Sequence, residues 1–106
     1  MTAIQTSQKV ASNPLAHRRM RLRYSFRFQQ VGNTFLGAAV GQNAHLFNGV
    51  LQLNEVGHFI VSRLNQPQTI DSLTEALTHE YEVDPPTARQ AVQQVIDYLQ
   101  QEGVLS

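Results

Sequence analysis

The chain has 106 residues, no cysteine and a formal net charge of zero at pH 7, and 42% of its residues are hydrophobic. This length fits one domain with a single core, and the lack of cysteine excludes disulfides, a thiol nucleophile and thiolate metal sites. No run approaches the roughly 18 to 20 apolar residues of a membrane helix, and the N-terminus lacks the apolar segment of a signal peptide, so we expect a cytoplasmic protein without a membrane partner.

The charges are divided between the two halves of the chain. Residues 1–54 contain six Lys and Arg residues and no acid, a charge of +6, whereas residues 55–106 contain two Arg residues and eight acids, a charge of −6. Such a division favours association with a charged partner. Two solvated faces that merely differ in composition would give the same pattern.

The first predicted element after the N-terminus is a long strand. Residues 1–18 are polar, contain Asn13-Pro14 and show no periodicity, which predicts a flexible arm ahead of a folded domain over residues 19–106. From Arg19 to Gln29, polar residues then alternate regularly with apolar ones. A period of two predicts a strand with one wet and one dry face. The apolar members are Met20, Leu22, Tyr24, Phe26 and Phe28.

This strand is longer than most, because ten residues at about 3.3 Å each span roughly 33 Å. We hypothesise that its apolar side packs on a partner protein or on a second copy, as a homodimer through residues 19–28. In either case the arginines would meet acidic groups of that partner. The alternative is that arginines along an edge simply discourage aggregation. The arginines concerned are Arg19, Arg21, Arg23 and Arg27.

Two further strands are predicted to complete a sheet. Gly32-Asn33 suits a two-residue turn, and residues 34–40 would return as the second strand. That turn sets Phe28 opposite Gly37, so that a large ring lies over a small partner, and Phe26 likewise opposite Ala39. A third strand is expected over residues 46–53, with a bulge at Asn48-Gly49.

Three amphipathic helices follow, each with its own start signal. Asn54, Thr69 and Asp84 are good N-caps, Pro85 suits a first turn, and Gly103 suits the left-handed position after a helix. The predicted fold is α+β, a winged helix-turn-helix-like domain in which a three-stranded antiparallel sheet precedes three helices (β-β-β-α-α-α). The apolar residues at helical spacing are Val56, Phe59, Ile60 and Leu64, then Ile70, Leu73, Leu77 and Tyr81, then Ala88, Val92, Val95 and Leu99.

No motif predicts catalysis or metal binding. Glu55-x-x-His58 lacks the second copy and the further carboxylates of a carboxylate-bridged metal site. His79-Glu80 lacks the second histidine of a zinc protease helix, and no serine lies in a Gly-x-Ser-x-Gly turn. We therefore expect no enzyme activity, no metal and no cofactor.

The helix-turn-helix order makes a winged-helix DNA-binding regulator the alternative function. The third predicted helix offers Arg89 and several glutamines, but Asp97 and Glu102 give it a net charge of −1. Because neutralisation of phosphates drives DNA binding, the acidic helical half disfavours a nucleic-acid partner.

The second half of the chain resembles the PqqD-like family, small peptide-binding modules named for pyrroloquinoline quinone (PQQ) biosynthesis. The resemblance covers roughly residues 24–105, and many members carry Trp at the position of Val61 and Asp at that of Ala91, so the chain is similar to a divergent member. The segments that carry the resemblance are Leu53-Asn54-Glu55, Thr69-Ile70, Glu80-Tyr81-x-Val83-Asp84 and Gly103-Val104-Leu105.

The resemblance implies a non-catalytic peptide chaperone, a recognition element for a ribosomally made and modified peptide (RiPP). Such a module binds the leader of a precursor peptide and presents it to a modifying enzyme, commonly a radical-SAM enzyme, which the charged surfaces would dock. In the family the leader adds as a strand to the third strand and packs on the third helix. Carried over, the edge would be formed by Phe47, Asn48, Gly49, Val50, Leu51 and Gln52. The facing helix side would be formed by Arg89, Val92, Gln93 and Ile96, unless Val92 and Ile96 belong to the core.

Overall fold

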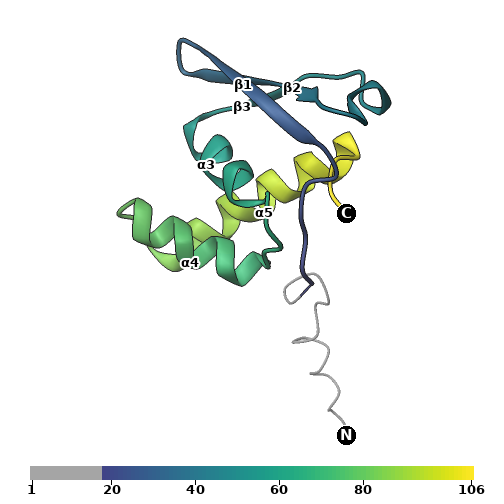
Figure 1. Ribbon diagram of the computed structural model, residues 1–106. Coiled ribbons are helices and arrows are strands. Elements are labelled where there is room, and N and C mark those ends of the chain that lie inside the picture. The colour runs from purple at the N-terminus through teal and green to yellow at the C-terminus, as the bar shows by residue number, and fades with distance from the viewer. Residues whose placement is uncertain (1–17) are drawn as a thin grey trace, which may run out of the picture.

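A computed structural model describes residues 18–106, and it contains one antiparallel sheet and three helices in the predicted order. The sheet has the order β1-β2-β3; α3 lies beneath it, and α4 and α5 lie beyond (Figure 1). The predicted α+β fold, β-β-β-α-α-α, is therefore confirmed. The predicted arm, residues 1–18, lies outside the described residues except for Arg18. The elements are β1 (Ser25–Val31), β2 (Thr34–Val40), the short 3₁₀ helix η2 (Ala44–Leu46), β3 (Leu51–Leu53), α3 (Glu55–Arg63), α4 (Ile70–Glu80) and α5 (Pro85–Glu102).

The β1–β2 hairpin has the predicted turn and register. Gly32 has a φ of 62°, a conformation that glycine adopts without strain, and Phe28 pairs with Gly37 while Phe26 pairs with Ala39. A Cβ atom at Gly37 would lie 2.8 Å from Cδ1 of Phe28. The ring therefore occupies the space that a larger residue at Gly37 would need.

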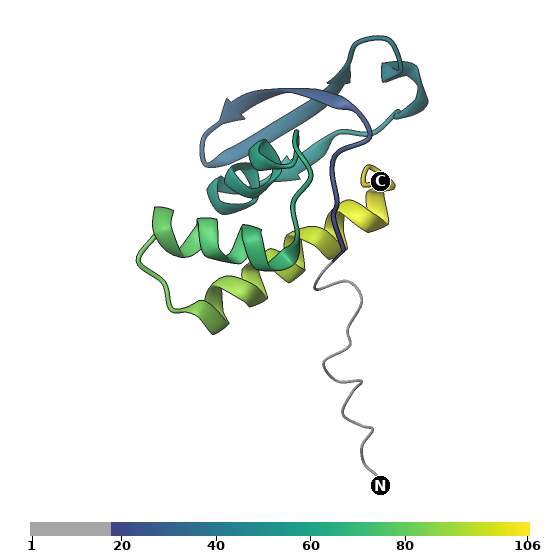
Figure 2. The same ribbon diagram turned by 60° about the horizontal axis from the view of Figure 1, so that its bottom comes forward.

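The predicted strand over residues 19–29 is wrong in its first half. β1 begins only at Ser25, and the chain bends at Arg23 and Tyr24. Before the bend it runs toward the helices (Figure 2), where Met20 forms an isolated antiparallel bridge with Gln68. A second bridge joins Leu22 to Leu105. Polar and apolar residues do alternate in this segment, but the segment pairs with the linker before α4 and with the last residues of the chain, not with β2.

The apolar side of this segment belongs to the chain's own core. Met20 is 3% exposed, and Leu22 and Tyr24 pack against buried residues. Met20 is thus covered within the molecule, whereas Leu22 and Tyr24 are only partly buried. The homodimer through residues 19–28 stays a prediction.

The third strand is shorter than predicted. β3 pairs with β2 only from Leu51 to Leu53, and Phe47 to Val50 form neither strand nor bulge. The ring of Phe47 stacks on Tyr24 at a centroid distance of 5.9 Å and meets Phe26 edge-on at 5.6 Å. This aromatic contact holds the segment away from β2, which continues to Val40 without a partner on that side.

All three predicted N-caps are confirmed. The side chain of Asn54 accepts the N–H of Gly57 at 2.8 Å, and Asp84 accepts that of Thr87. Thr69 and Ser72 form a reciprocal capping box, each side chain accepting the other's backbone N–H. The hydrogen bonds between Asp84 and Thr87 lower the pKa of the Asp84 carboxyl.

The helices and β3 enclose one core. Gly103 ends α5 in the predicted left-handed conformation, with a φ of 76°. No helix within residues 18–106 has both the length and the apolar composition needed to cross a membrane. The largest completely buried side chains are Leu51, Ile60, Val61, Leu64, Ile70, Leu73, Val92, Ile96, Leu99 and Val104.

Replacing Thr69 by alanine tests the capping box. Thr69→Ala removes the acceptor for the Ser72 N–H, so we expect the free energy of unfolding to fall by about 1 kcal/mol. Thr78→Ala makes the same chemical change inside α4 and should alter it by less than about 0.5 kcal/mol. Urea denaturation measures both variants, and an equal loss in the two would contradict a specific capping role.

Candidate functional site

The outer edge of β3 faces α5. In an antiparallel ladder, successive residues direct their backbone groups alternately toward the partner strand and away from it. Gln52 lies on the outward phase, because its N–H donates to the hydroxyl oxygen of Tyr98 on α5 at 2.9 Å. Of the predicted edge, Gln52 therefore presents its backbone groups outward, Leu51 directs its own toward β2, and a side chain of the same molecule already bonds to Gln52.

The chain around β3 and helix α5 run side by side in opposite directions. Near the start of β3, a Cβ on Gly49 would lie 3.7 Å from Oε1 of Glu102. Just beyond its end, Val56 and Ala91 line one cavity. The Gln52–Tyr98 bond lies between these two points. We call the space between the β3 region and α5 the groove, and these three contacts define the side of α5 that faces it. This side carries Ala91, Val95, Tyr98 and Glu102, which share a helix face at 100° per residue and are all partly buried.

The four helix residues predicted for this groove lie elsewhere. Val92 and Ile96 are completely buried in the core, the alternative that the sequence left open for them. Arg89 lies on the flank toward α4, where its guanidinium donates to the carboxylate of Asp71. Gln93 donates to Asp97 at 2.9 Å on the same helix. The sequence does carry a signal for the flank that lies beside β3, because Ala91, Val95 and Tyr98 are apolar or amphipathic residues at helical spacing.

An apolar cavity of about 220 Å³ lies at one end of the groove, where α4 ends and α5 begins. The Tyr81 hydroxyl at its rim donates to Glu55 at 3.1 Å. Burial, together with this hydrogen bond, raises the pKa of Tyr81 above its ordinary value. The cavity is lined by Val56, Leu77, Tyr81, Val83, Thr87, Ala88 and Ala91.

The residues considered for metal binding serve as packing groups or solvated side chains. The His58 ring stacks on Phe35 at 4.2 Å and meets Phe28 edge-on at 4.9 Å. His79 lies on the surface, 3.9 Å from Glu75. Within residues 18–106, no group of three or more His, Asp or Glu side chains is placed to hold a metal ion. What the site offers is an edge of backbone donors and acceptors beside an apolar helix face.

The bond between Gln52 and Tyr98 can be tested by amide hydrogen exchange. Tyr98→Phe removes the acceptor, so we expect the Gln52 amide to exchange about fivefold to tenfold faster, as the loss of one net hydrogen bond implies. Tyr81→Phe makes the same change at the hydroxyl bonded to Glu55 and should leave the Gln52 rate unaltered. Unchanged exchange at Gln52 in the Tyr98 variant would show that this bond does not protect the edge.

Comparison with known proteins gives one family and a similar fold. A family model described as "Coenzyme PQQ synthesis protein D (PqqD)" matches residues 38–105. A solved structure titled "TbiB1 in Complex with the TbiA(beta) Leader Peptide" superposes with a TM-score of 0.59. It is 19% identical, and the match covers 81% of this chain and 94% of that one, a level of identity that shows a shared fold. No curated protein matches the chain.

Proposed function

This chain belongs to the PqqD family, and we propose that it is a non-catalytic recognition module that binds the leader of a ribosomally made precursor peptide and presents it to a modifying enzyme. The observation that carries the proposal is the outer edge of β3, where the Gln52 N–H faces a partly apolar side of α5. An edge of this kind recognises extended peptides, because backbone hydrogen bonds supply affinity and side-chain pockets supply selectivity.

The bound leader takes the place of the Tyr98 hydroxyl. A strand that adds to β3 brings its own carbonyl oxygen to the Gln52 N–H, so the present bond from Gln52 to Tyr98 must open. Val50, which precedes β3, is 53% exposed, so the added strand can extend past the end of β3. Because the leader loses conformational entropy when it becomes ordered, we expect moderate affinity.

Selectivity comes from the apolar cavity at the end of the groove. Its volume of about 220 Å³ and its apolar lining suit an aliphatic or aromatic side chain of the leader. Ala91, at its edge, occupies the position where many family members carry Asp. We infer that this chain selects a leader with an apolar residue where those relatives meet an acidic wall.

The structure supports peptide binding better than DNA binding. If α5 were a recognition helix, its best polar groups, Arg89 and Gln93, would already be bonded to Asp71 and Asp97. The same helix carries no other basic residue. Binding to DNA would have to break these bonds and bring two carboxylates close to the phosphates, which opposes it electrostatically.

Titration with a synthetic leader tests the proposal. The leader of the precursor encoded beside the gene should shift the amide resonances of Gln52 and of the groove face of α5. Ala91→Asp puts a charge into the apolar cavity, so we expect the Kd to rise at least about tenfold. Gln90→Asp adds the same charge to the exposed face of α5, about 100° around the helix from Ala91, and should change the Kd less than about twofold. A leader that shifts neither Gln52 nor α5 would refute the proposed function.

Removing the Tyr98 hydroxyl should strengthen leader binding. In Tyr98→Phe the Gln52 N–H is no longer bonded in the free protein, so the leader displaces nothing and its Kd should fall about twofold to tenfold. Isothermal titration calorimetry compares this variant with Tyr81→Phe, in which the Gln52 bond is kept. A weaker rather than tighter complex would mean that the hydroxyl itself binds the leader.

A further inference from the structure

The sheet has a second unpaired edge, on β1. A two-residue hairpin loop closes on a hydrogen-bonded pair, here Val31 and Thr34. Counting back along β1 by alternate residues, Phe26 and Phe28 direct their backbone N–H and C=O groups away from β2. Within residues 18–106, no hydrogen bond from outside the hairpin reaches these groups. β1 pairs over seven residues against three in β3, so this is the longer of the two edges.

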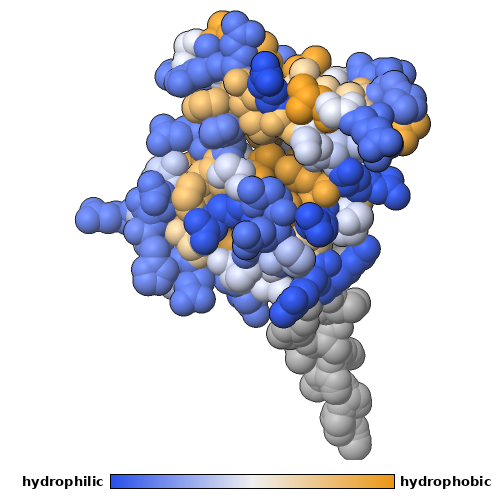
Figure 3. All heavy atoms as spheres, viewed as in Figure 1, coloured by the Kyte–Doolittle hydropathy of each residue, from blue (hydrophilic) through white to orange (hydrophobic). Residues whose placement is uncertain are grey.

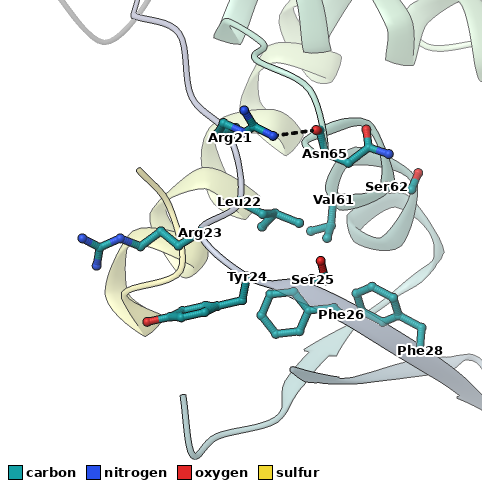
Figure 4. A pocket seen from close by; sticks show the side chains of 10 residues that line it. All are labelled: Arg21, Leu22, Arg23, Tyr24, Ser25, Phe26, Phe28, Val61, Ser62 and Asn65. Atoms are coloured by element: carbon teal, nitrogen blue, oxygen red, sulfur yellow. Dashed lines mark hydrogen bonds between the residues drawn. The ribbon is translucent and has the colours of Figure 1, made fainter. Parts of the chain in front are cut away.

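A cavity of about 500 Å³ lies under this edge, between β1 and the C-terminal half of α3 (Figure 4). Apolar side chains gather between the sheet and the helices on this face of the molecule, with hydrophilic ones around them (Figure 3). The apolar lining consists of Leu22, Tyr24, Phe26, Phe28 and Val61. The polar lining consists of Arg21, Arg23, Ser25, Ser62 and Asn65.

The wall of the cavity is held in place by backbone bonds. The N–H of Leu22 donates to the carbonyl of Leu64 at 2.9 Å, and that of Arg23 donates to the carbonyl of Val104 at 2.8 Å. At one end, the Arg21 guanidinium donates to the backbone oxygen of Asn65 at 3.4 Å (Figure 4). Because these contacts cross between distant parts of the chain, the cavity is part of the fold and does not depend on a ligand to form it.

The charges around the cavity have one sign. Residues 18–31 include five arginines and no acid. Within the described residues, Arg21, Arg23 and Arg27 form no ion pair. Clustered cations without counter-charges attract an acidic partner and repel a basic one.

We propose that the outer edge of β1 and this cavity form a second docking surface, for an acidic extended segment of a partner protein. The segment adds to β1 as a fourth strand. Its side chains then alternate between the two faces of the sheet, with apolar ones entering the cavity beside Phe26 and Phe28 and acidic ones lying beside Arg27 on the outer face. Acids at one end of the segment meet Arg21 and Arg23.

A strand of a second copy of the chain does not fit this description. β1, β2 and β3 contain no acidic residue, and the acids of the chain lie on helices and in the loops next to them. If the proposed function holds, the partner is the enzyme that modifies the peptide. Because β1 and β3 are opposite edges of one sheet, the leader and the enzyme segment can bind at the same time without competing for backbone groups.

A designed peptide tests the surface without knowledge of the enzyme. The probe is the blocked peptide acetyl-Glu-Val-Glu-Phe-Glu-Val-Glu-amide, titrated into the isotopically labelled full chain, and we expect shifts at Phe26, Phe28 and Ser62. In Arg23→Gln/Arg27→Gln the Kd should rise about threefold to tenfold, the effect of two exposed ion pairs. Arg89→Gln removes a charge on the far flank of α5 and should change the Kd less than about twofold.

Three outcomes would overturn the proposal. The first is the absence of shifts at Phe26, Phe28 and Ser62. The second is equal binding of a matched peptide with glutamine in place of every glutamate, which would show that the surface does not select an acidic segment. The third is a dimer mass in light scattering that disappears in Arg23→Gln/Arg27→Gln, which would assign the edge to a second copy. Failure of the proposed function is seen separately, as the absence of leader-induced shifts at Gln52.

Discussion

The rotation of α5 about its own axis determines where the functional groups of this protein lie. Four of its side chains, Ala88, Val92, Ile96 and Leu99, are buried against the other helices and β3. Removing any of the larger three from the core would cost about 2 to 5 kcal/mol, so the helix cannot turn. Once this stripe is fixed, Tyr98 must face β3, and the opposite flank must face α4.

The sequence predicts the local structure well and the long-range contacts poorly. Caps, helical stripes and the Phe28–Gly37 pairing depend on neighbouring residues, so they can be read from spacing. The alternation from Arg19 onward is the same whether the segment continues a sheet or bridges to Gln68 and Leu105, and only tertiary packing selects the second. The groove face of α5 was missed for a related reason, because a helical stripe identifies the buried side but not which flank meets the sheet.

The division of charge along the chain persists in space and remains largely unneutralised. Five arginines lie before and on β1, whereas the acids lie on and around the helices together with Arg63 and Arg89. Within the described residues, one arginine–carboxylate pair forms, between Arg89 and Asp71, and both of its members belong to the helical half. Exposed pairs of that kind contribute about 0 to 1 kcal/mol to stability. The segregation therefore contributes more to association with charged partners than to the fold.

The two edges of the sheet are protected against unwanted strand pairing by different means, and the means determine which peptide can pair with each edge. An unpaired edge invites pairing with any extended chain. At β3 the edge is short and the Tyr98 hydroxyl bonds to it, so only a peptide whose other contacts offset the loss of that bond can displace the hydroxyl. At β1 the edge is longer, and arginines flank it without neutralising groups. Charge repels basic strands there but admits acidic ones. In the binding modes that we propose, each protection thus acts as a filter, the first for side chains that fit the groove and the second for the charge of the incoming strand.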